Sequence, residues 1–221
     1  MMKIIVSDRI IEACPKFTGA AVLADVQNSD YNEALWREID AFADVCRNLY
    51  TTEDIKTIPS IAATRAVYKA LGKDPSRYRP SGEQLMRRVL QGKELYKIDT
   101  LVDLINLASM KYGYSIGGFD ADRIQGDVIT LGVGEKDEPY EGIGRGMLNI
   151  EGLPVYRDKL GGIGTPTSDN ERTKMRPETV RILAVINGYD GDLQHVAENA
   201  AYIQQLLRLY GYSNGGDVIL F

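Results

Sequence analysis

The segment TLVDLINLASMKYGYSIGGFD, residues 100–120, joins the start of a helix to a pair of glycines and a Phe-Asp dipeptide. Thr100 and Asp103 have the spacing of a capping box, which satisfies free amides of the first helical turn. Gly113 is the expected C-terminal cap, because glycine adopts the left-handed conformation at little cost. The segment therefore predicts a capped helix that leads into a glycine-rich elbow ending at Asp120. The apolar residues at helical spacing, expected to be buried, are Leu101, Leu104, Ile105 and Ala108.

Helical and strand patterns follow one another in mixed order on both sides of this segment. Short runs rich in β-branched residues predict strands at residues 3–11, 19–26, 126–134, 153–158, 180–188 and 217–221. Apolar residues at intervals of three and four predict further helices at residues 31–50, 58–72, 81–92 and 193–210. This order of elements predicts an α+β fold, with antiparallel or mixed β-sheets packed by helices, in one domain that spans residues 1–221.

Two of these helices carry start signals of their own. Asp30 with Glu33 is a cap-like pair at the start of the helix at residues 31–50, and Ser81 with Gln84 has the spacing of a capping box. The apolar face of the helix at residues 31–50 is expected to comprise Leu35, Ile39, Phe42, Val45 and Leu49.

The composition indicates an ordinary globular protein, since 44% of its 221 residues are hydrophobic and 26% are charged. No apolar run approaches the roughly 18 residues of a membrane span, and the charged N-terminal segment lacks the apolar stretch of a signal peptide. We therefore expect a soluble cytoplasmic protein without a membrane partner. A net charge of −5 argues against tight, non-specific binding of nucleic acid, so any RNA contact requires a local basic patch.

The residues that most often bind metals are few. Cys14 and Cys46 lie far apart and lack Cys-x-x-Cys spacing, so we expect two buried free thiols. The single histidine, His195, lies beside the apolar face of its helix and is expected at the surface. No metal site and no cofactor are predicted, because these residues do not form a His/Cys cluster. Residues 142–146, GIGRG, lack the lysine of a P-loop and precede no convincing helix.

Two polar segments are candidates for binding. Residues 77–93 concentrate basic side chains around one predicted helix, either as a solvated helix face or as a site for phosphate groups. Residues 161–174, GGIGTPTSDNERTK, form a loop longer than a plain strand connection, and such a loop is either functional or simply solvated. The basic residues of the first segment are Arg77, Arg79, Arg87, Arg88 and Lys93.

The order of motifs between residues 77 and 190 resembles the B3/B4 domain of the phenylalanyl-tRNA synthetase beta subunit. The resemblance is carried by residues 100–131, by YEGIGRGMLNIEGLPVYRD at residues 140–158 and by TSDNERTKMRPETVRILAVINGYD at residues 167–190. The basic segment before them resembles the form in which this domain occurs without the synthetase. In the resembling family the domain hydrolyses tyrosine wrongly attached to the phenylalanine tRNA, and the elbow helps to line a cleft between sheet and loops.

Taken position by position, the resemblance implies a pocket for an aminoacyl group. The family's glutamate after its glycine-rich loop matches Glu171, and residues 169–170, Asp-Asn, replace two glycines before it. Glu171 is the implied catalytic residue. Gly117 stands where the family has a histidine. The implied pocket residues are Asn106, Gly117, Phe119, Asp120, Thr165, Ser168 and Asn170, and the implied RNA contacts are Arg77, Arg79, Arg87, Arg88, Arg172 and Lys174.

Two functions stay open at this stage. The resemblance implies a stand-alone domain that interacts with tRNA and hydrolyses a mischarged aminoacyl-tRNA in trans. The alternative is a non-catalytic binder of an amino acid or related small ligand in the same cleft. A protein-interaction module would instead expose an apolar patch. If the resemblance holds, Gly117 and Glu171 lie on the rim of one cleft.

Overall fold

The computed structural model describes residues 2–221, which form two four-stranded β-sheets and a short hairpin. One sheet has the order β1–β4–β7–β8, in which only β1 and β4 are parallel. The other has the order β10–β2–β9–β3 and is antiparallel. The predicted α+β class, with antiparallel and mixed sheets, is confirmed. The strands are β1 (Lys3–Val6), β2 (Thr18–Asp25), β3 (Ile116–Asp120), β4 (Val128–Val133), β5 (Glu141–Gly142), β6 (Gly146–Met147), β7 (Pro154–Asp158), β8 (Gly161–Gly164), β9 (Arg181–Gly188) and β10 (Asp217–Leu220).

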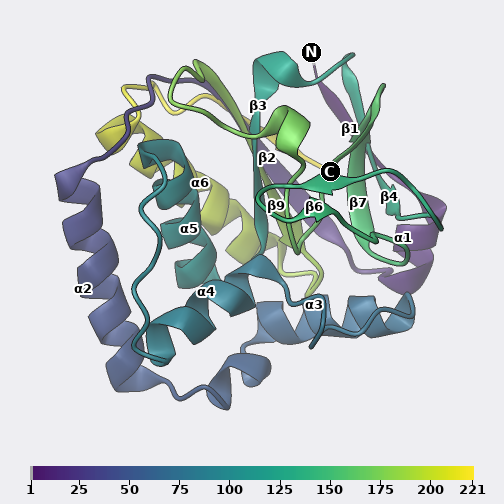
Figure 1. Cartoon of the computed structure of the whole chain (residues 1–221), viewed down its shortest axis with the longest axis horizontal. Coiled ribbons are helices and arrows are strands. Elements are labelled where there is room, and N and C mark those ends of the chain that lie inside the picture. The colour runs from purple at the N-terminus through teal and green to yellow at the C-terminus, as the bar shows by residue number, and fades with distance from the viewer. Residues whose placement is uncertain (1) are drawn as a thin grey trace.

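The antiparallel sheet is the middle layer of the molecule. Figure 1 shows helices α2, α5 and α6 on one side of it and strands β1, β4 and β7 on the other. No helix among residues 2–221 is long and apolar enough to cross a membrane. The helices are α1 (Asp8–Ala13), α2 (Glu33–Leu49), α3 (Pro59–Ala70), α4 (Ser81–Leu90), α5 (Thr100–Tyr112) and α6 (Leu193–Tyr210), with the 3-10 helices η1 (Asp54–Thr57), η2 (Ala121–Arg123) and η3 (Glu171–Thr173).

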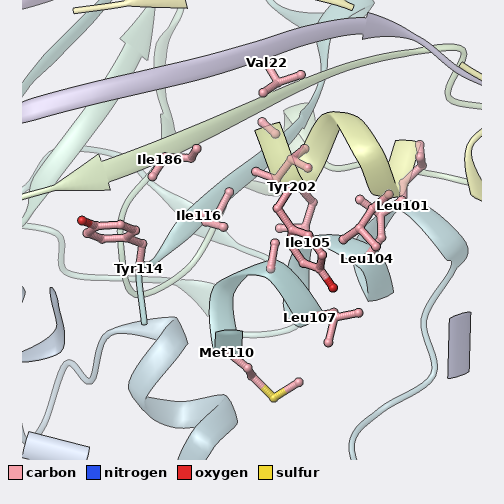
Figure 2. Packing of buried hydrophobic residues seen from close by; sticks show 14 of the residues in the cluster. Val22, Leu101, Leu104, Ile105, Leu107, Met110, Tyr114, Ile116, Ile186 and Tyr202 are labelled. Atoms are coloured by element: carbon pink, nitrogen blue, oxygen red, sulfur yellow. The ribbon is translucent and has the colours of Figure 1, made fainter. Parts of the chain in front are cut away.

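The central strands β2 and β9 contribute side chains to both main cores. Successive side chains of a strand point to opposite faces, so Val22 and Ile186 pack in the helical core while Ala21 and Val185 pack against the other sheet. Figure 2 shows Val22 and Ile186 near the helix that carries Ile105. The nearly continuous apolar sequence of β9 follows from this position, because a strand covered on both faces has no polar side.

The start of α5 differs from the predicted capping box. Asp99 is the cap, and its carboxylate accepts a hydrogen bond from the amide of Val102 at 2.9 Å. Asp103 instead accepts a hydrogen bond from Trp36 Nε1 at 2.6 Å, and burial raises the pKa of Asp103 to about 6. The predicted end of the helix is confirmed, since Gly113 has a φ of 72°. The predicted buried residues Leu101, Leu104, Ile105 and Ala108 are confirmed too.

Three predictions about element ends are wrong. Residues 8–11 belong to α1 instead of extending the first strand, since the chain turns so that Ile10 enters the core. Asn32, and not Asp30, accepts the capping hydrogen bond of α2. Ser81 is the first residue of α4 and makes no side-chain cap, so the predicted capping box there does not form.

Two glycine-rich segments form strands where the sequence predicts an elbow and a loop. Residues 116–120 form β3, which pairs with β9 along its whole length. Residues 161–164 form β8, so the loop predicted at residues 161–174 begins only after this strand. Residues 142–146 include the turn of the β5–β6 hairpin. In β3 and β8 the pairing with a neighbouring strand outweighs the low strand propensity of glycine.

Most predictions of burial for single residues hold. Cys14 and Cys46 are buried free thiols, as predicted. Three residues differ from the prediction. His195 is half-buried instead of lying at the surface, and its Nε2 lies 3.1 Å from a backbone carbonyl of α5. Val45 and Leu49 are 48% and 67% exposed, although the predicted apolar face of α2 includes them.

Candidate functional site

A cavity of about 640 Å³ lies where α5, β3 and the segment between Thr165 and Glu178 meet. Small-molecule sites in proteins typically measure about 300–1,000 Å³ and combine apolar walls with a few polar groups. The apolar lining consists of Ile98, Val102, Ile105, Ile116, Ile143, Met175 and Pro177. The polar lining consists of Ser81, Asp99, Asn106, Ser109, Thr165, Ser168, Asp169, Lys174, Arg176 and Glu178.

The glycine pair of β3 lies beneath this cavity. The amide of Gly118 donates a hydrogen bond to Asp169 Oδ2 at 3.1 Å. A Cβ atom at Gly118 would lie 2.6 Å from Met175 Cε, and one at Gly117 would lie 2.7 Å from the ring of Phe119. Gly117 therefore leaves room for the buried Phe119 ring, whereas a side chain at Gly118 would displace the flexible end of Met175 at the cavity.

Asp169 is the ionisable side chain whose environment is most altered in the cavity. Burial raises the pKa of its carboxyl to about 7, although the hydrogen bond from Gly118 acts in the opposite direction. A carboxylate that titrates near neutral pH is suited to accept and release protons under physiological conditions. Asp169 is not among the pocket residues that the family resemblance implies. The one available signal was that an acid occupies a position where the resembling family has glycine.

The altered pKa of Asp169 has a measurable effect on stability. The ionised carboxylate is more costly in the folded protein than in the unfolded chain, so stability is lost as the pH rises from about 4 to about 7. Asp169→Asn removes this cost and keeps an acceptor for Gly118. We expect the variant to be more stable by about 4 kcal/mol above pH 7 and nearly equal to the wild type near pH 4. Thermal unfolding across this pH range measures the difference, and a constant or inverted difference contradicts the raised pKa.

A closed turn fixes the chain immediately before Asp169. The hydroxyl of Thr165 donates to the carbonyl of Ser168 at 3.0 Å and accepts a hydrogen bond from the Ser168 amide at 3.1 Å. The hydroxyl of Tyr140 donates to the same carbonyl at 2.7 Å. Thr165 and Ser168, two polar residues of the cavity lining, therefore lie on a turn that is held by internal hydrogen bonds. This turn positions them before a ligand binds.

Asn106 extends into the opposite side of the cavity from α5. Its side-chain amide makes no hydrogen bond within residues 2–221, whereas the nearby Ser109 hydroxyl donates to the carbonyl of Tyr114. Asn106 thus retains both amide donors for a ligand.

The structure brings three of the implied pocket residues to the cavity, namely Asn106, Thr165 and Ser168. The other four and Glu171 lie outside its lining. Phe119 is buried between the two sheets, and Asp120 accepts a hydrogen bond from Thr179 Oγ1 at 3.0 Å. Asn170 caps η3, and Gly117 packs against the ring of Phe119.

Glu171 lies next to the cavity and forms an ion pair with Lys174, which does line it. The backbone of Phe119 pairs with that of Lys174 in an isolated bridge. The strand with Gly117 and the segment with Glu171 are therefore neighbours, although the two residues do not face the cavity themselves. No feature of residues 2–221 tests the catalytic role that the resemblance implies for Glu171.

Several implied RNA contacts are engaged within the protein. Glu83 is fully buried, and its carboxylate lies 2.8 Å from Arg65, 3.0 Å from Arg87 and 3.6 Å from Arg79. Part of the basic segment therefore compensates a buried charge. Arg88 instead packs its guanidinium over an exposed tyrosine ring.

Arg172 is also held by an internal partner. It forms a bidentate pair with Asp158, with N–O distances of 2.8 and 2.9 Å, and the Asp158 side chain is buried. Hydrogen bonds from Arg172 and from backbone amides lower the pKa of Asp158 and outweigh its desolvation. Arg77 remains exposed. Within the set implied by the resemblance, Arg77 and Arg88 are therefore the arginines best placed to meet RNA.

The architecture is that of a three-layer α+β protein whose ligand-sized cavity lies between a helix, an inner strand and a long loop. Residues 63–204 match the B3/4 domain family, and the chain belongs to this family. The match confirms the resemblance seen in the motifs. No curated protein matches the sequence.

The fold is similar to that of a solved N-terminal fragment of the phenylalanyl-tRNA synthetase beta-subunit from Pyrococcus horikoshii. The similarity covers 98% of this chain with a TM-score of 0.54 and 14% sequence identity. The chain matches 50% of that fragment. At this identity the likeness concerns the fold.

Proposed function

We propose that the cavity receives the aminoacyl group of a mischarged tRNA and that the protein hydrolyses the ester bond. The observation that carries the proposal is Asp169, a carboxyl with a pKa of about 7 in a cavity of about 640 Å³ with an apolar wall. Such a group accepts a proton at neutral pH, and the apolar wall suits an amino-acid side chain. Membership of the B3/4 domain family and the likeness to a synthetase fragment support the same substrate class.

The reaction uses a water molecule and no other reagent. Asp169 takes a proton from the water, and the water oxygen attacks the carbonyl carbon of the ester. The bond between that carbon and the ribose oxygen breaks, and the ribose oxygen receives the proton from Asp169. The free amide of Asn106 is suited to donate to the carbonyl oxygen as negative charge develops there.

Binding of the tRNA itself should be weak and sensitive to salt. The net charge of the chain is −5, and Arg79, Arg87 and Arg172 are paired with internal carboxylates. We expect phosphate contacts to be made instead by cations without a buried acidic partner, such as the exposed Arg77 and the half-buried Arg88. The logarithm of the affinity should decrease with the logarithm of salt concentration by about 0.9 for each phosphate contacted.

A deacylation screen tests the proposed function. The full chain is incubated at pH 8 with a panel of correctly and incorrectly charged tRNAs, and loss of the aminoacyl group is compared with spontaneous hydrolysis. We expect selective acceleration for at least one tRNA that carries an apolar amino acid. No acceleration across the panel, with the protein folded, would remove the proposed activity.

A second function is favoured by one observation. Asp169 and Arg176 line the same cavity and carry opposite charges, as the two ends of a free amino acid do. A non-catalytic amino-acid binder would use Asp169 for the ammonium and Arg176 for the carboxylate. This second function would be favoured if the protein bound a free amino acid with micromolar affinity and deacylated none of the tRNAs in the panel.

A further inference from the structure

Arg176 lines the cavity without a partner for its charge. No carboxylate of residues 2–221 lies within ion-pair distance of its guanidinium, and its side chain makes no hydrogen bond in that part of the chain. The Nε atom is buried and unsatisfied. By contrast, Arg157 and Arg172 are paired with Glu138 and Asp158. A buried donor without an acceptor is costly, so Arg176 is suited to receive one from a ligand.

The backbone holds Arg176 in place from two sides. Its amide donates to Thr179 Oγ1 at 2.9 Å, and its carbonyl accepts a hydrogen bond from Asn28 Nδ2 at 2.8 Å. Thr179 in turn donates to Asp120 at 3.0 Å. Asp120, which the resemblance implies as a pocket residue, thus anchors the segment that carries Arg176. The backbone of Arg176 is therefore fixed at the edge of the cavity before any ligand arrives.

We propose that Arg176 binds the phosphate of the terminal nucleotide to which the amino acid is esterified. This inference rests on the proposed function. An esterified amino acid has no free carboxylate, so the nearest anion on such a substrate is the phosphate of the same nucleotide. A guanidinium forms parallel hydrogen bonds with a phosphate. The cavity of about 640 Å³ also has room for more than one amino-acid side chain.

The test measures binding without hydrolysis. The probes are 3′-phenylalanylamino- and 3′-leucylamino-3′-deoxyadenosine, each with and without a 5′-phosphate, titrated calorimetrically into the full chain. We expect the phosphorylated probe to bind about tenfold more tightly, since bidentate charged hydrogen bonds are strong. In Arg176→Ala the two forms should bind equally, and Arg176→Lys should keep part of the preference. Because Arg176 has no internal partner, both variants should unfold at or above the wild-type temperature.

The matched control is Arg181→Ala, which removes the same charge from the surface outside the cavity lining. It should leave the phosphate preference intact. Equal binding of both forms by the wild type, no binding of either phosphorylated probe, or an equal loss in the control would overturn the assignment.

A further comparison separates the phosphate from the carboxylate of a free amino acid. If phenylalanine binds more tightly than phenylalaninamide and Arg176→Ala removes that difference, Arg176 serves the carboxylate and the phosphate assignment is overturned. If the protein binds the phosphorylated probe through Arg176 but deacylates no tRNA, the phosphate subsite is supported and the proposed hydrolysis is rejected. The two proposals therefore fail separately.

Discussion

Asp169→Asn should lower the rate of aminoacyl-tRNA hydrolysis by about 10²–10⁴-fold, the usual contribution of a general base. The change keeps the hydrogen bond from Gly118 and the shape of the cavity floor, but it removes the group that accepts the proton from water. Single-turnover deacylation at pH 8 measures the effect. The wild-type rate should also rise with pH through about 7 as Asp169 ionises, and this rise should be absent from the residual rate of the variant.

Glu171→Gln is the matched control, because it removes a carboxylate next to the cavity in the same loop. Glu171 lies outside the cavity lining and is paired with Lys174, so we expect a change of less than about tenfold. The opposite ranking, with Glu171→Gln inactive and Asp169→Asn active, would transfer the catalytic role to the residue that the family resemblance implies.

Arg87→Glu should destabilise the protein by about 3 kcal/mol, because it places a second carboxylate beside the buried Glu83. For a protein of this size the unfolding temperature should drop by about 6–12 °C. Arg88→Glu, one position further along α4, should cost about 1 kcal/mol or less, since Arg88 packs on an exposed tyrosine and has no buried acid to neutralise. Equal unfolding temperatures for the two variants would contradict the structural role of Arg87.

This difference determines how RNA binding should be tested. A variant that combines changes at Arg87 and Arg88 would lose affinity through partial unfolding as well as through lost phosphate contacts. The double variant Arg77→Glu, Arg88→Glu leaves the ion pairs of Glu83 intact. A loss of tRNA affinity in this variant would therefore show that Arg77 and Arg88 contact phosphates, because the fold is preserved.

The elements with strong local signals could be predicted from the sequence. The apolar spacing of α5 and the glycine at its end are encoded within a few residues, and β9 is recognisable by its apolar run. β3 could not be predicted, because Gly117 and Gly118 have low strand propensity and the strand depends on its pairing with β9. The predicted caps of α2 and α5 are wrong because neighbouring polar residues fit the same motif, and α4 begins after Pro80 without any side-chain cap.

The candidate site could be predicted in part. Thr165, Ser168 and Asn106 follow from the family motifs and line the cavity. The pKa of Asp169 depends on burial beside Gly118, which lies 51 positions away in the chain, so no local pattern reveals it. The pairing of Arg87 with Glu83 depends likewise on how deeply α4 is buried.

The most direct test of the cavity as the functional site is a crystal structure of the protein with 3′-phenylalanylamino-3′-deoxyadenosine 5′-phosphate. We expect the phenylalanyl side chain against Ile105 and Met175, the amide carbonyl next to Asp169, and the phosphate on Arg176. The site would be contradicted by a structure in which the probe, at a concentration that saturates binding in solution, lies elsewhere on the protein and leaves this cavity empty.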